Sequence, residues 1–149
     1  MDSIMKRNEV LWKLRDAKKA HRKWVGFAYA LIEGVSLEKE QVPVNETDCA
    51  FGLWFFGEGQ DFNHKEVFSE IGKHHQKLHQ VYTEIYVLLF GEQKRSFFQK
   101  LVGKKAKVSE ETRALARKKY NKLNEISHQL IRKIEELETE IKGSEEASA

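Results

Sequence analysis

Apolar residues recur at helical spacing over three long stretches of this 149-residue chain. In the first stretch they are Val10, Leu14, Ala17, Trp24, Ala28 and Leu31. The second stretch contains Phe68, Ile71, Leu78, Tyr82, Ile85 and Leu89. In the third, an unbroken seam steps by four and three through Ala116, Tyr120, Leu123, Ser127, Leu130, Ile134, Leu137 and Ile141. Residues three and four apart share one face of an α-helix, so each stretch predicts a long helix with one buried face.

Start and stop signals divide the chain further. We expect helices over Ser3–Ile32, from Cys49 to near Gly57, over Asn63–Phe90 and from Ser109 onward. Gly34 is a plausible terminator of the first, and Thr47 or Asp48 is a candidate N-cap of the second. The predicted fold is all-α: an antiparallel four-helix bundle with a short second helix carrying the cysteine and a long C-terminal helix.

Two segments fall outside this pattern. The basic, mixed segment 92–108 suggests a short helix followed by a connector, and the small, acidic residues 143–149 predict a disordered tail. Residues 1–142 then form a single domain. The C-terminal seam is long enough that we expect part of it to reach a partner, most simply in a homodimer. The start Met1-Asp-Ser and the polar end favour a stand-alone protein over an excised domain.

The composition indicates where in the cell the protein is located and which classes of partner it disfavours. It contains no run of 18 apolar residues and no signal-peptide pattern, which argues against membrane insertion and export. A single cysteine suits a reducing compartment, so we expect the cytoplasm. The net charge is +3, and basic residues line the first helix. Acids elsewhere nearly balance them and no nucleic-acid motif is present, so a solvated face is favoured over a nucleic-acid interface.

Four side chains carry the most specific chemistry: His21, Cys49, His75 and His79. His21 occupies a slot on the apolar face of the first helix, and His75 and His79 lie four residues apart, so that their rings can point the same way. Cys49 opens a helix, where the positive end of the helix dipole favours the thiolate. Three imidazoles and one thiolate complete a tetrahedral zinc shell.

The alternative for each of these residues is an ordinary core position, because single buried histidines and cysteines are common without any ligand. That interpretation weakens for the set, since three buried imidazoles without a shared partner leave several polar nitrogens to satisfy, at about 1–3 kcal/mol each.

The flanking residues form three motifs: His21-Arg-Lys-Trp24, Cys49-Ala-Phe-Gly-Leu-Trp54 and His75-Gln-Lys-Leu-His79. In type, order and separation they resemble the signature motifs of the chemoreceptor zinc-binding domain. The resemblance implies that His21, Cys49, His75 and His79 bind Zn²⁺ and that Trp24, Gly52 and Trp54 are packing residues. His64, His74 and His128 match no motif position.

Members of that family are cytoplasmic regulatory domains of chemotaxis receptors or diguanylate cyclases that sense zinc or reactive chlorine species. By resemblance, we expect a zinc-binding sensory module that is not an enzyme, whose partner is a chemoreceptor or a cyclase. This chain carries neither a methyl-accepting domain nor a cyclase domain, so its output is open.

Two other classes compete with this prediction. A di-iron bundle of the hemerythrin or ferritin type needs several carboxylates facing one cavity, and Glu-x-x-His pairs at core positions are missing. A metal-free helical adaptor would use the C-terminal seam to bind a partner and keep the histidines and the cysteine as core.

Overall fold

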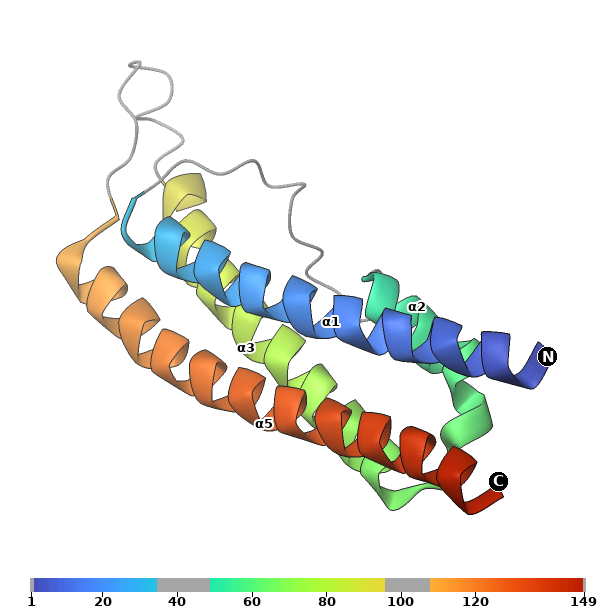
Figure 1. Ribbon diagram of the computed structural model, residues 1–149. Helices are drawn as coiled ribbons and strands as arrows, with labels where there is room; N and C mark the ends of the chain where they lie inside the picture. The colour runs from blue at the N-terminus through green and yellow to red at the C-terminus, as the bar shows by residue number, and fades with distance from the viewer. Residues whose placement is uncertain (1, 35–48, 96–107, 149) are drawn as a thin grey trace.

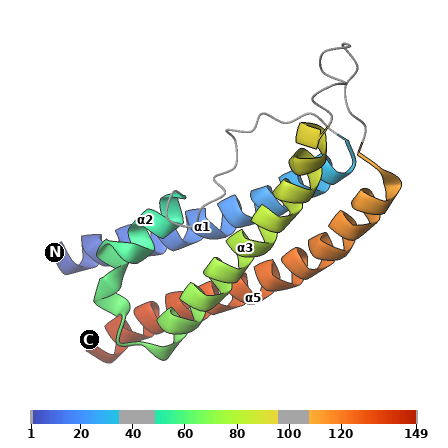
Figure 2. The same cartoon turned by 180° about the vertical axis from the view of Figure 1, so that it is seen from behind.

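The computed structural model describes residues 2–34, 49–95 and 108–148. Its elements are α1 (Asp2–Ile32), α2 (Ala50–Phe56), the 3-10 helix η2 (Glu58–Phe62), α3 (Glu66–Arg95) and α5 (Glu110–Ser148). Helix α5 runs antiparallel to both α1 and α3, and short α2 packs beside the N-terminal half of α1 (Figure 1). From behind, α3 lies lengthwise beside α5 (Figure 2). The predicted all-α helical bundle is confirmed.

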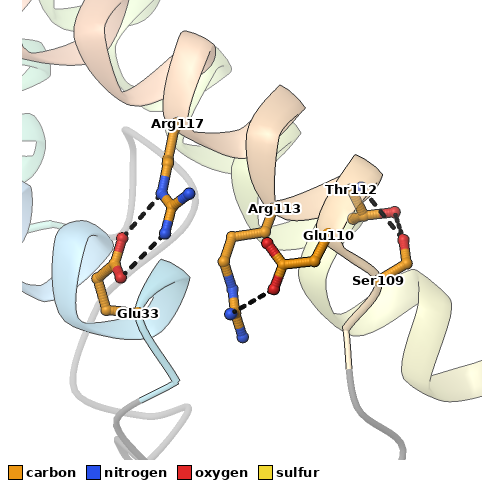
Figure 3. A network of polar contacts seen from close by, with 6 residues as sticks. All are labelled: Glu33, Ser109, Glu110, Thr112, Arg113 and Arg117. Carbon is orange, nitrogen blue, oxygen red and sulfur yellow. Dashed lines mark hydrogen bonds and ion pairs between the residues drawn. The ribbon is translucent and has the colours of Figure 1, made fainter.

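The helix ends follow the sequence signals closely. Helix α1 stops where Gly34 adopts a φ of 91°, a left-handed conformation that suits glycine. Ser109 caps α5, since its Oγ accepts a hydrogen bond from the backbone N–H of Thr112 at 3.2 Å (Figure 3). The proposed caps of the second helix, Thr47 and Asp48, lie outside the described residues.

The tail predicted over residues 143–149 is helical as far as Ser148 in the structure, and its disorder stays a prediction. Helix α5 continues through Gly143 to Ser148. One glycine costs a helix only about 1 kcal/mol, which does not end a helix that is packed over its preceding turns. Of the segment 92–108, residues 92–95 complete α3, and residues 96–107 lie outside the described residues.

The C-terminal seam is used inside this chain. Its leucines and isoleucines, together with Ala116, are between 0% and 5% exposed, and Ser127 is 2% exposed. The bundle's own helices therefore cover the seam as far as Ile141, and a partner helix would have to bind a different face. The homodimer itself stays a prediction.

Ion pairs connect α1 with α5 at two places along the helices. Lys18 on α1 meets Glu138 on α5 at 2.6 Å, where both side chains are largely covered. At the other end of the same two helices, the Arg117 guanidinium donates to both carboxylate oxygens of Glu33 at 3.0 and 3.2 Å (Figure 3). The hydrogen bond from Arg117 holds the pKa of Glu33 below its usual value. Each such pair contributes little to stability, so the pairs are consistent with this alignment of α1 against α5 and add modestly to the buried apolar contacts.

Helix α2 packs tightly against α3 at Gly72. A Cβ atom there would lie 2.7 Å from Cζ of Phe55, whose ring stacks on Phe68 with centroids 4.2 Å apart. We therefore expect Gly72→Ala to lower the free energy of unfolding by about 1–3 kcal/mol through overpacking, measured by urea titration. Gly26→Ala is the matched control, because nothing lies within 4 Å of its added Cβ. That change should stabilise α1 by about 0.5–1 kcal/mol, and equal effects at the two sites would contradict the packing argument.

Candidate metal centre

The structure brings together all four predicted ligands. His21 comes from α1, Cys49 from the residue preceding α2, and His75 and His79 from α3. Their ligand atoms all lie within 4.8 Å of one another. The four side chains are buried, none of them more than 4% exposed. Residues up to 58 positions apart in the chain, from His21 to His79, thus face one small, buried volume.

The spacing of these atoms fits a tetrahedral zinc shell. Cys49 Sγ lies 3.3 Å from Nε2 of His75, and that nitrogen lies 3.1 Å from Nε2 of His79. Bond lengths of about 2.0–2.1 Å for Zn–N and 2.3 Å for Zn–S place neighbouring ligand atoms of a tetrahedron about 3.3–3.6 Å apart. These two edges are close to those of a zinc shell and slightly contracted, and all the edges lie within 4.8 Å.

The backbone of α1 fixes which nitrogen His21 presents to the cluster. Its Nδ1 lies 2.6 Å from the carbonyl oxygen of Ala17, one turn earlier, and only a protonated Nδ1 can donate to that oxygen. Nε2 is then the unprotonated nitrogen, and it is buried without a hydrogen-bond partner. A buried lone pair left unsatisfied beside a thiol and two imidazoles is what a metal ligand requires.

Cys49 is itself the N-cap of α2. Its sulfur accepts a hydrogen bond from the backbone N–H of Gly52 at 3.1 Å, while its backbone stays extended at φ −80° and ψ 152°. A sulfur that accepts an N–H bond is favoured in the thiolate form, the form that binds metal. The cap that the sequence suggested at Thr47 or Asp48 is therefore made by the ligand itself.

Burial keeps the imidazoles neutral. Desolvation, reinforced by the neighbouring His21 and His79, lowers the pKa of His75 to about 2. Desolvation also lowers the pKa of His21 to about 4, although the hydrogen bond to Ala17 opposes the shift. Neutral imidazole is the metal-binding form, so near pH 7 the cluster needs to lose no proton from these two rings.

Aromatic rings enclose the cluster. The Trp24 ring meets His21 edge to face at 4.6 Å between centroids and lies 5.8 Å from His79. Phe51 contacts both His21 and His75, at 5.6 and 4.9 Å. Trp24 was anticipated at this wall, whereas Phe51 was not singled out from the sequence. Its place two residues after Cys49, in the first turn of α2, was the available signal.

The remaining motif residues serve α2 rather than the imidazoles. Trp54 packs against Phe51 and Phe62, and a Cβ atom on Gly59 would lie 2.8 Å from its carbonyl oxygen. Gly52 is buried and supplies the N–H that reaches Cys49. A close approach between α2 and α3 lies at Gly72, where an added Cβ would meet the Phe55 ring.

The other histidines stay apart from the cluster, as the motif spacing indicated. His74 lies beside the Glu70–Lys133 pair at the α3–α5 boundary, where partial burial and the charge of Lys133 lower its pKa. His64 and His128 are exposed. Because His74 lies outside the cluster, it provides a control for its neighbour His75.

Comparison with known families agrees with this geometry. The sequence profile of the chemoreceptor zinc-binding domain matches residues 21–86. The match begins at His21 and extends past His79, so it contains all four candidate ligands. Neither a curated protein nor a solved structure matches the chain.

Proposed function

We propose that this chain is a zinc-binding sensory or regulatory module of the chemoreceptor zinc-binding domain family, whose model matches residues 21–86. One observation carries the proposal: three imidazoles and a thiol, all buried, converge within 4.8 Å. Soft and borderline ligands in this ratio suit Zn²⁺ better than the hard cations.

The same set argues against catalysis at this centre. A zinc site that activates water keeps one coordination position open, whereas four protein ligands fill a tetrahedral shell. Bound zinc would join α1, α2 and α3 at one point, so its role here is to hold helices together.

Cys49 is the residue through which we propose that the site responds. Hypochlorous acid, reduced to chloride, would oxidise the thiolate to a sulfenic acid, which is a poor zinc ligand. Because Cys49 begins α2, losing its metal bond frees the short helix from α1 and α3. Removal of zinc by a strong chelator would have the same consequence without oxidation.

The output that we propose for the module rests on family context alone. We propose that it acts in bacterial signal transduction such as chemotaxis or cyclic-di-GMP control, in the cytoplasm, as a homodimer that contacts a chemoreceptor or a cyclase. A metal-free adaptor is the alternative, and the metal content of the protein separates the two.

Elemental analysis of the untagged protein tests this function. We expect about one zinc per chain in the wild type and in His74→Ala, and little zinc in His75→Ala. The reason is that, of the two neighbours His74 and His75, only His75 faces the cluster. One equivalent of hypochlorous acid should release zinc from the wild type. Absence of metal from all three proteins would support the adaptor, and zinc retained by His75→Ala would refute the ligand assignment.

A further inference from the structure

The side of α1 turned away from the bundle carries an unusual combination of side chains. Met5 and Trp12 are 69% and 64% exposed, and Lys19 follows Trp12 by a further seven residues. Seven residues are close to two turns, so the three side chains form one stripe along the helix. Arg15, Arg22 and Lys23 lie beside or along this stripe and are exposed. We call these six residues the outer face of α1.

The outer face carries an excess of positive charge. Helix α1 holds eight basic and three acidic residues, for a net charge of +5. Within the chain, Lys13 pairs with Glu58 and Lys18 with Glu138, and the Lys23 ammonium lies over the Phe27 ring. Among the described residues, the four bases of the outer face pair with no carboxylate, although exposed Asp16 lies on the same helix.

A different side of the molecule is acidic. Helices α3 and α5 form a groove lined by one arginine, Arg132, and by five glutamates, namely Glu66, Glu70, Glu135, Glu136 and Glu140, and no residue of α1 lines it. Lys65 pairs with Glu140, and Lys133 pairs with Glu70 and Glu136, so the negative charge of the groove is partly neutralised. The groove is still less positive than α1, whose net charge is +5. Near a negatively charged surface, this asymmetry would turn α1 toward the surface and the groove away from it.

We propose that the outer face of α1 binds an anionic lipid surface. Exposed Trp beside Lys and Arg is typical of helices that lie in the headgroup region, where the ring enters the interface and the bases meet lipid phosphates. Spanning is not involved, because no helix in the described ranges is long and apolar enough to cross a membrane. The proposal is independent of the metal site, whose four ligands point into the bundle.

Vesicle co-sedimentation with the full chain tests the proposal. The wild type should sediment with vesicles of equal parts phosphatidylglycerol and phosphatidylcholine, and not with phosphatidylcholine alone. Each basic residue near such a surface contributes about fivefold to binding, so Arg15→Glu with Lys19→Glu should weaken binding by about 25-fold or more. Lys118→Glu with Lys122→Glu is the matched control, because it changes the net charge equally at exposed positions of α5.

Tryptophan emission gives a second readout on the same samples. Trp24 and Trp54 are 9% and 6% exposed, so a blue shift on adding anionic vesicles would report Trp12 entering the interface. Unchanged circular dichroism and zinc content in both double variants would show that the fold is kept. Failure of the wild type to sediment, or an equal loss in the two double variants, would overturn the proposal. Retention on duplex DNA without vesicle binding would also overturn it.

Discussion

Removing bound zinc should lower the free energy of unfolding of this protein by about 4 kcal/mol, the linkage expected when a ligand is present at roughly a thousand times its Kd. The expected fall in Tm is about 8–16 °C for a chain of this size. The structural reason is that α1, α2 and α3 meet at the cluster while α2 has only seven residues of its own. Thermal unfolding with and without a strong chelator measures the effect.

Two variants make that experiment specific. His75→Ala should already unfold at the lower temperature and should not respond to chelator. His74→Ala should respond as the wild type does, because it lies outside the cluster. Added zinc should restore the wild type. Loss of zinc from the wild type with no change in Tm would mean that the metal does not hold the helices together.

Sequence periodicity predicted the three long helices because burial repeats every three or four residues along each of them. The ligand set was predictable for a related reason. His75 and His79 share a face by local geometry alone, and the motifs around His21 and Cys49 supplied the long-range pairing that periodicity cannot give. Their convergence within 4.8 Å depends on the register of α1 against α3, which only the folded chain fixes.

Details that depend on contacts between helices were harder to foresee. The close approach of α2 to α3 occurs at Gly72, because the Phe55 ring projects there. The wall formed by Phe51 and the capping role of Cys49 likewise depend on how α2 sits between its neighbours. The seam of α5 has the same pattern whether its cover is intramolecular or a second chain, so the sequence alone left both open.

The metal-free protein should lose stability steeply as the pH falls below about 6.5. His21 and His75 are held neutral in the fold, with pKa values lowered to about 4 and about 2, whereas an unfolded histidine titrates near 6.5. Below pH 6.5 the unfolded chain therefore binds more protons than the native one, and stability falls with decreasing pH. The loss continues until the pH reaches the folded pKa values.

One variant tests whether His75 is the origin of this loss of stability. Between pH 6.5 and about 4.5, each histidine that stays neutral in the fold lowers the free energy of unfolding by on the order of 2 kcal/mol, because protonation stabilises only the unfolded chain. His75→Leu fills the same space with an apolar side chain that does not titrate. Over that pH range, the free energy of unfolding of metal-free His75→Leu should therefore fall by about 2 kcal/mol less than that of the metal-free wild type. Urea titrations at a series of pH values measure both slopes. Parallel slopes would show that the fold does not lower the pKa of His75 and would contradict the argument from burial.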